Sequence, residues 1–109
     1  MRPLIDFSAY CASKGGLVMF SKALAMDLAA DNIRVNVICP GIVMTPMVER
    51  RLAIAPDRKA AVAAFLDKRL MNRFGTAAEI ASAALFLSCD ESSFVTGTAL
   101  GVDGGAVFH

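Results

Sequence analysis

The chain holds 109 residues, a length that allows one domain at most. Its formal net charge is +1, so no strongly charged surface marks a nucleic-acid or anionic-membrane partner. Hydrophobic residues make up 56% of the chain, which is high for a small soluble domain and suggests faces that are covered on several sides.

Apolar runs and cysteines exclude further classes of protein. Charged residues interrupt the longest apolar run, residues 15–30, so no segment is predicted to span a membrane. The amino terminus lacks the layout of a secretion signal, and we expect a cytoplasmic protein. The cysteines are widely spaced without a CxxC pair, and the only histidine, His109, is the last residue; we therefore expect no metal site. Reduced, buried thiols are expected at Cys11, Cys39 and Cys89.

The first elements along the chain are a loop and a long helix. Residues 1–8 have no apolar period and are expected to form a loop. Residues 9–30 place apolar side chains at helical spacing, which predicts a helix. Gly15 and Gly16 weaken this helix by about 1 kcal/mol each relative to alanine. Such a glycine pair favours a second backbone packed close beside the helix.

A strand and a less regular region follow. Residues 33–39 form a β-branched run closed by Pro40 and Gly41, which predicts a strand that ends in a turn. Residues 44–55 are expected to be irregular or weakly helical. Pro56 suits the first turn of a helix that would run to about residue 71.

The last third predicts a helix and a strand. Thr76 and Glu79 form a capping box in front of an apolar run, which predicts a helix over residues 77–89. Residues 98–102 are a brief apolar stretch before an Asp-Gly-Gly sequence at residues 103–105, which indicates a final strand and a terminal turn.

This alternation of helices and strands determines the expected fold class, which is α/β. Strands that alternate with helices form a parallel sheet with helices on its faces. Two strands do not make a stable parallel sheet, and such strands are usually buried on both sides. The chain is therefore expected to be one side of a larger doubly wound domain, with residues 1–109 as a partial single domain.

Tyr10 and Lys14 are the most promising pair for proton transfer. Their spacing puts them on one face of the first helix, about 6 Å apart along its axis. Ionising an ordinary tyrosine at neutral pH costs roughly 4 kcal/mol. A lysine charge about 4 Å away returns a similar amount at an effective dielectric of 20. Such pairs are common on helix surfaces, so the pair alone is weak evidence for catalysis.

Four segments match a known set of motifs in the same order. Residues 8–14 read Ser-Ala-Tyr-Cys-Ala-Ser-Lys, with a Tyr-x-x-x-Lys core, and residues 33–45 contain a Pro-Gly-x-Val-x-Thr turn after a strand. Residues 73–81 follow an Arg-x-Gly…Glu-hydrophobic-Ala pattern, and residues 96–105 run from Thr-Gly to Asp-Gly-Gly. Together these motifs resemble the short-chain dehydrogenase/reductase family over nearly the whole chain.

The resemblance implies a Rossmann-like, doubly wound parallel sheet of which this chain is the carboxyl-terminal portion, with the amino-terminal half missing. It implies an oxidoreductase that interconverts an alcohol and a carbonyl by hydride transfer with NAD or NADP. Tyr10 would act as the general acid/base at the oxygen of a small-molecule substrate. Lys14 would assist Tyr10 and hydrogen-bond the nicotinamide ribose.

The same resemblance assigns the turn after the first strand to the cofactor. Pro40 and Gly41 would turn the chain past the nicotinamide. The Val43 backbone would hold the carboxamide, and the Thr45 hydroxyl would contact the same end of the cofactor. Residues 47–71 would form a mobile lid over the substrate.

The family's glycine-rich phosphate turn and catalytic serine normally precede these motifs, and neither occurs in this sequence. One hypothesis is therefore a fragment of an active enzyme, inactive as the isolated chain. A second is a non-catalytic truncated product that acts, if at all, through protein association. A third is an unrelated α/β binding module, which would require the ordered motifs to be coincidence. The resemblance also implies a homodimer or homotetramer for the complete protein, with subunit contacts in residues 77–102, and neither nucleic acid nor membrane as a partner.

Overall fold

A computed structural model describes residues 7–106, and the expectations for residues 1–6 and for His109 lie outside this part. The elements in chain order are α1 (Ser8–Leu28), η1 (Ala29–Asp31), β1 (Val37–Pro40), α2 (Pro46–Ala53), α3 (Arg58–Leu66), α4 (Ala77–Ser88), η2 (Asp90–Ser92) and β2 (Ala99–Val102). The predicted order of helix, strand, helices and strand is correct, and the α/β fold class is confirmed.

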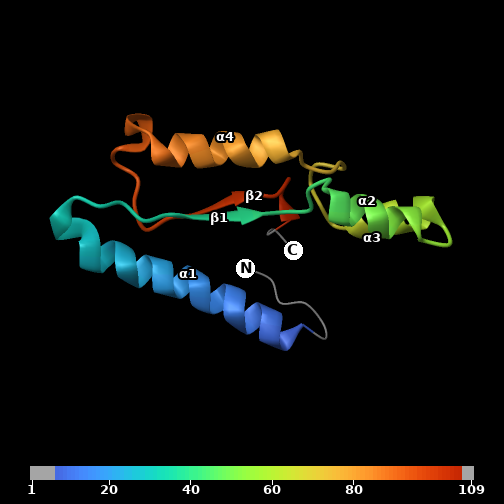
Figure 1. Ribbon diagram of the computed structural model, residues 1–109, viewed down its shortest axis with the longest axis horizontal. Helices are drawn as coiled ribbons and strands as arrows, with labels where there is room; N and C mark the ends of the chain where they lie inside the picture. Colours follow the sequence, from blue (N-terminus) through green and yellow to red (C-terminus); the bar gives the residue numbers. More distant parts are fainter. Residues whose placement is uncertain (1–6, 107–109) are drawn as a thin grey trace.

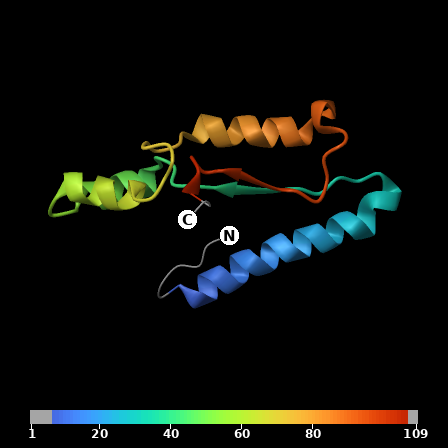
Figure 2. The ribbon, with the colours of Figure 1, turned by 180° about the vertical axis from the view of Figure 1, so that it is seen from behind.

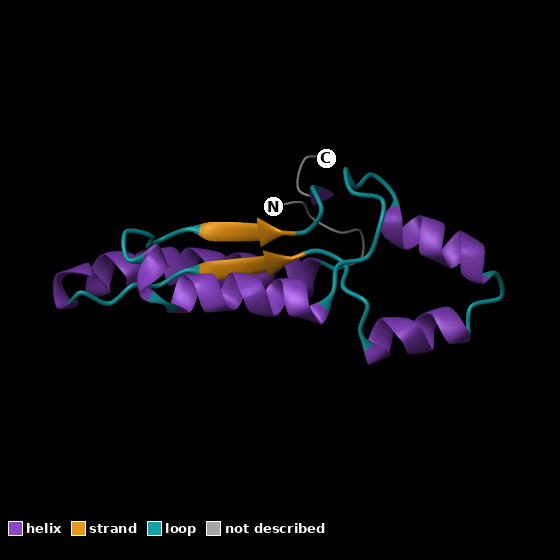
Figure 3. Cartoon of the chain, turned by 90° about the horizontal axis from the view of Figure 1, so that it is seen from above, coloured by secondary structure: helices purple, strands orange, loops and turns teal. Residues whose placement is uncertain are grey.

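The two strands form a parallel sheet with a continuous register. Val37 pairs with Ala99 at one end, and Pro40 pairs with Val102 at the other. Helix α4 lies on one side of the strands and α1 on the other, as seen from the front and from behind (Figures 1 and 2). Helices α2 and α3 form a hairpin that projects beyond the carboxyl ends of both strands (Figure 3).

The first strand is shorter than predicted, because it begins at Val37 and not at residue 33. In the preceding segment, one backbone bond, from the Gly97 N–H to the Val35 carbonyl oxygen at 2.8 Å, is supplemented by side-chain bonds. The Asn36 side chain accepts a hydrogen bond from the Thr98 N–H at 3.2 Å and donates one to the Val95 carbonyl oxygen at 2.9 Å. The β-branched run that predicted a longer strand is therefore joined, ahead of Val37, to the residues before β2 largely through side-chain hydrogen bonds.

Arg34 fixes the connection between α4 and β2. Its guanidinium donates hydrogen bonds to the carbonyl oxygens of Leu87 at 3.0 Å, Cys89 at 3.2 Å and Val95 at 3.0 Å. A cation at the carboxyl end of a helix is favoured because the last carbonyls of the helix carry partial negative charge. The end of α4 is thereby tied to the segment that leads into β1.

Helix α2 is more regular than the expected irregular or weakly helical segment. Thr45 is its N-cap, since the Thr45 Oγ1 accepts a hydrogen bond from the Val48 N–H at 3.3 Å. Pro46 follows at the first helical position, where its fixed φ and missing N–H carry no penalty. Val48 and Leu52 are buried on one side of this helix, and that packing stabilises a short segment of low propensity.

The helix predicted from Pro56 to residue 71 is wrong at both ends. Asp57 is the N-cap, and its carboxylate accepts a hydrogen bond from the Ala60 N–H at 3.1 Å, so Pro56 lies before the helix. The helix ends at Leu66, and Lys68 takes a left-handed conformation with φ of 59°. The remaining residues return towards the sheet without regular structure.

The apolar core of the described residues is small and divided between two places. Ala25, Val48 and Leu52 are the buried hydrophobic residues, with 3%, 3% and 1% of their surface exposed. Ala25 lies where the end of α1 meets the loop before β2, because a Cβ at Gly97 would lie 3.8 Å from the Ala25 Cβ. The other two belong to the α2–α3 hairpin, which therefore has a core of its own.

The predicted apolar stripe of α1 is exposed at Leu17 and Phe20 and half-buried at Leu24 and Leu28. Leu17 and Phe20 expose 51% and 62% of their surface. A Cβ added at Gly15 or Gly16 would meet nothing within 4 Å, so no backbone among residues 7–106 packs beside this glycine pair. The close neighbour expected from the sequence is therefore not part of the described chain.

Incomplete coverage also corrects the prediction for the cysteines. Cys11, Cys39 and Cys89 are half-buried rather than buried, because the strands and helices around them are packed on few sides.

Among residues 7–106, no helix combines the length and apolar character needed to cross a membrane. The same residues bring together no group of three or more histidine, cysteine or acidic side chains that could hold a metal ion.

Candidate active site

The candidate site lies at the carboxyl ends of the two strands. Helix α1 runs opposite to the strands, so its amino-terminal end lies at that end of the sheet (Figure 1). The segment that leaves β1, the turn that leaves β2 and the α2–α3 hairpin also lie there (Figures 1 and 2). Ligands of open α/β sheets bind at this edge, because the loops after parallel strands gather there.

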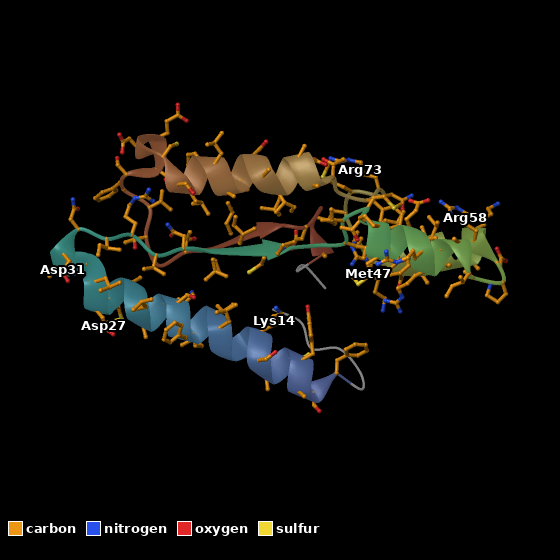
Figure 4. All side chains as sticks on the ribbon, in the orientation of Figure 1. Lys14, Asp27, Asp31, Met47, Arg58 and Arg73 are labelled. Carbon is orange, nitrogen blue, oxygen red and sulfur yellow. The ribbon has the colours of Figure 1, made fainter. Side chains whose placement is uncertain are left out.

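Helix α1 brings the two predicted catalytic side chains together. The Lys14 Nζ lies over the Tyr10 ring, 5.6 Å from the ring centroid, a distance typical of a cation–π contact. Phe7 packs edge-on against the Tyr10 ring at 6.2 Å. Tyr10 is 52% exposed, and Lys14 lies on the side of α1 that faces the sheet (Figure 4). The phenol is therefore held by two neighbours and remains accessible.

Neighbouring serines on this helix do not form a nucleophilic site. The Ser13 hydroxyl donates a hydrogen bond to the Tyr10 carbonyl oxygen at 2.8 Å, one turn earlier in the helix. Ser8 is the first residue of α1 and is exposed. Both serines act as ordinary residues of the first helical turns.

The bend after β1 is built on a close approach between two backbones. The Gly41 N–H donates to the Val102 carbonyl oxygen at 3.0 Å, which extends the pairing of the strands by one residue. A Cβ at Gly41 would lie 2.6 Å from the Asp103 Cα and 2.8 Å from the Asp103 carbonyl oxygen. Glycine is therefore required here by the chain itself. Sequence reasoning gave the Pro40-Gly41 bend a cofactor role and missed its contact with Asp103.

The backbone N–H and carbonyl of Val43 are not used in hydrogen bonds within residues 7–106. The Gly75 N–H donates to the Ile42 carbonyl oxygen at 3.0 Å, and the Met44 N–H donates to the Gly75 carbonyl oxygen at 3.0 Å. These two bonds bracket Val43 in an isolated parallel bridge to Gly75. They use neither the N–H nor the carbonyl of Val43, which has no hydrogen-bond partner within residues 7–106. One donor and one acceptor are thus available side by side.

Thr45 is placed at the start of the hairpin, where its oxygen caps α2. No hydrogen bond, ion pair or ring contact joins Tyr10 or Lys14 to residues 40–45 in the described part of the chain. The structure therefore presents two groups of predicted site residues at the same end of the sheet. One group is on α1, and the other is on the segment that follows β1.

A cavity of about 430 Å³ lies beside the second group. It opens between the end of β2, the start of α4 and residues 70–75, which lead from the hairpin back to the sheet. Ile42, Arg73 and Glu79 are among its lining residues. Tyr10 and Lys14 do not line it. The Asp103 carboxylate borders this cavity, with Oδ1 accepting a hydrogen bond from the Gly105 N–H at 2.9 Å.

Arg73 and Glu79 form a two-bonded ion pair at the rim of this cavity. Arg73 Nη1 and Nη2 donate to Glu79 Oε1 and Oε2, each at 2.8 Å. The Thr76 N–H donates to Glu79 Oε1 at 3.0 Å, which completes the predicted capping box of α4. The Arg73 hydrogen bonds, followed by the Thr76 backbone bond, lower the pKa of the Glu79 carboxyl from 4.5 to about 2. Glu79 in turn raises the pKa of Arg73.

Acid is expected to loosen the start of α4. Because the pKa of Glu79 is lower in the folded chain, its stabilising contribution is complete above pH 4.5 and is lost as the pH falls towards about 2. A titration of the Glu79 carboxyl carbon by NMR should show this low midpoint. Arg73→Gln should move the midpoint back up towards 4.5, since the largest cause of the shift is removed. Equal midpoints in the two proteins would contradict the assignment.

Comparisons with known proteins fit this geometry. The family described as enoyl-(acyl carrier protein) reductase matches residues 2–107. The 3-oxoacyl-(acyl-carrier-protein) reductase FabG of Thermotoga maritima is 44% identical over 98 residues, which covers 90% of this chain and 37% of that protein. The chain spans about two-fifths of the length of the curated relatives it matches.

Solved structures agree with the sequence comparison. L-sorbose reductase from Gluconobacter frateurii, in complex with NADPH and L-sorbose, matches with a TM-score of 0.88 and 33% identity, over 98% of this chain and 43% of that one. A 4-hydroxyisoleucine dehydrogenase in complex with NADH matches with a TM-score of 0.84 and 31% identity, over 94% of this chain and 40% of that one. The fold is therefore shared with oxidoreductases whose structures hold NADH or NADPH.

Proposed function

The chain belongs to the short-chain dehydrogenase/reductase family, and on that basis we propose that the protein containing it interconverts an alcohol and a carbonyl with NAD or NADP. The observation that carries the proposal is the contact between Tyr10 and Lys14 at the carboxyl end of the sheet. A phenol and an ammonium one helical turn apart suit proton transfer at a substrate oxygen.

Tyr10 acts as the general acid in the reducing direction and as the general base in the oxidising direction. Its hydroxyl donates a proton to the carbonyl oxygen as that oxygen gains negative charge. The Lys14 ammonium lies 5.6 Å from the ring centroid, so a positive charge stands close to the group from which the proton leaves. The exposed ring leaves room for a substrate oxygen beside the hydroxyl.

The segment after β1 fits the nicotinamide end of the cofactor. Val43 offers one backbone donor and one backbone acceptor, and a carboxamide presents the complementary acceptor and donor. The Thr45 oxygen accepts a bond in the cap of α2, so its hydrogen remains available to donate. Pro40 and Gly41 direct the chain past this position, and Lys14 is assigned to the ribose. The bound cofactor supplies the hydride.

The α2–α3 hairpin is proposed as the lid over the substrate. It projects from the end of the sheet at which the two groups of site residues lie (Figure 3). The relatives are named for substrates that differ widely in size, a 3-oxoacyl-(acyl carrier protein) and the sugar L-sorbose. A lid that is joined to the sheet through its two connecting segments can serve such different substrates while the sheet stays the same.

Cofactor binding tests the proposal directly. The complete protein should quench or enhance NADH or NADPH fluorescence in a saturable way. Residues 1–109 alone should give no saturable change, because their sequence contains no glycine-rich phosphate turn. Saturable binding to neither cofactor by the complete protein would refute the proposed function. A micromolar dissociation constant for residues 1–109 alone would refute the need for the missing turn.

Association with other copies is proposed through the exposed side of α4. Leu85 and Phe86 expose 69% and 42% of their surface on this helix, although both are large and apolar. Exposed apolar groups gathered on one element favour a subunit contact. This observation supports a homodimer or homotetramer for the complete protein.

A further inference from the structure

We propose that the turn at residues 103–105 is an anchor that positions the α2–α3 hairpin and thereby sets the affinity for substrate. The part of this inference that concerns substrate rests on the proposed function. Two segments that are far from the turn in the sequence contact it: the bend at Gly41 and residues 70–71, where the chain returns from the hairpin to the sheet. Each contact involves the backbone of the turn.

The turn binds the hairpin's return segment through two adjacent glycines. The Met71 N–H donates to the Gly104 carbonyl oxygen at 2.8 Å. A Cβ at Gly105 would lie between 2.6 and 2.7 Å from three side-chain carbons of Leu70. Gly104 and Gly105 have φ values of 62° and 86°, in the left-handed region that favours glycine. The backbone of the turn can therefore press against Leu70 with no side chain between them.

The same turn touches the segment that leads into the hairpin. The Asp103 backbone fills the space that a side chain at Gly41 would need. Further along, the Gly75 backbone joins the return segment to Ile42 and Met44 by two hydrogen bonds of 3.0 Å. The connections into and out of the hairpin are thus held to one another, and the turn is in contact with both.

The hairpin beyond these contacts is built to move as one body. Val48 and Leu52 are buried within it, and the Arg51 guanidinium lies 5.7 Å from the centroid of the Phe65 ring. The Phe65 ring also contacts the Phe74 ring of the return segment at 6.1 Å. Because the hairpin has its own core, a displacement at the anchor moves the hairpin as a unit and changes how it covers the substrate.

Gly105→Ala tests the anchor, with Gly97→Ala as a matched control. Both glycines have positive φ, 86° and 72°, but a Cβ at Gly97 would only approach Ala25 at 3.8 Å, at the other end of the strands. In the complete protein without substrate, Gly105→Ala should speed hydrogen exchange of the hairpin amides about tenfold, since the strain favours the displaced state. Gly97→Ala should leave their exchange rate unchanged.

Steady-state kinetics and a second substitution sharpen the test. Gly105→Ala should raise KM several-fold while kcat stays within about twofold, because the lid and not the proton-transfer pair is displaced. Leu70→Ala removes two of the three colliding carbons, so the double variant should recover part of the slow exchange. Leu70→Ala alone should loosen the hairpin less than Gly105→Ala does, because Leu70 is 64% exposed and the Met71–Gly104 hydrogen bond remains.

The outcomes separate this inference from the proposed function. Equal exchange of the hairpin in Gly105→Ala and Gly97→Ala would overturn the anchor, whatever the protein catalyses. Failure of Leu70→Ala to restore any protection would overturn the Leu70 contact as its cause. A protein without NADH- or NADPH-dependent turnover would overturn the proposed function, and the exchange comparison would still decide the anchor.

Discussion

Tyr10→Phe is expected to lower kcat of the complete protein by about 10²- to 10⁴-fold, the usual contribution of a positioned general acid. The substitution keeps the aromatic ring, and with it the edge-on contact to Phe7 and the Lys14 contact over the ring face. Only the hydroxyl that donates the proton is removed. Cofactor affinity should therefore change little while the chemical step slows, which steady-state and single-turnover kinetics can separate.

Ser13→Ala is the matched control for this prediction. It also removes one hydroxyl from the same helix face, but that hydroxyl is hydrogen-bonded to the backbone at Tyr10. Its loss should leave kcat close to the original value. Full activity in the Tyr10→Phe protein would remove Tyr10 from the mechanism, and a comparable loss in both variants would indicate a structural cause.

The largest effect on stability is expected from Gly41→Ala, which should lower the free energy of unfolding by about 3 kcal/mol, the upper range for overpacking. The added Cβ would lie 2.6 Å from the Asp103 Cα, so it collides with backbone and not with a side chain that can rotate away. The two strands end at this point, and relief requires them to separate. Denaturant unfolding of the complete protein measures the change.

Gly75→Ala provides the comparison. A Cβ at Gly75 would meet Val43 Cγ2 at 3.6 Å and the Ile42 carbonyl oxygen at 3.7 Å, which are ordinary contact distances. Its stability should change by less than about 1 kcal/mol. If Gly41→Ala were as stable as Gly75→Ala, the approach of the two backbones at this bend would not be a structural requirement.

Local signals in the sequence predicted much of the fold. The capping box of Thr76 and Glu79 located the start of α4, because both hydrogen bonds join residues within one helical turn. The spacing of Tyr10 and Lys14 likewise predicted one shared helix face, and the ammonium does lie over the ring. Their catalytic roles remain predictions. Features decided by neighbours three or four residues away were thus accessible from sequence.

Long-range contacts were not accessible in this way. No sequence pattern near Gly41 predicts that the Asp103 backbone occupies the space that a side chain at Gly41 would need. The late start of β1 depends on the Asn36 amide bonding to residues near β2, and propensity alone predicted a longer strand. The buried pair Val48 and Leu52 stabilised a helix where the sequence predicted an irregular or weakly helical segment. In each case tertiary packing overrode a weak local preference.

The manner in which the hairpin is joined to the sheet bears on how such proteins diversify. Its connecting segments are held by main-chain bonds at Ile42, Met44 and Gly75, and these bonds do not depend on side-chain identity. Its buried residues are Val48 and Leu52, and Phe65 packs against Arg51 and Phe74. Substitutions across the rest of the hairpin can accumulate without disturbing the paired strands. If the hairpin is the proposed lid, such substitutions would change which substrate it accepts while the remainder of the domain stays constant.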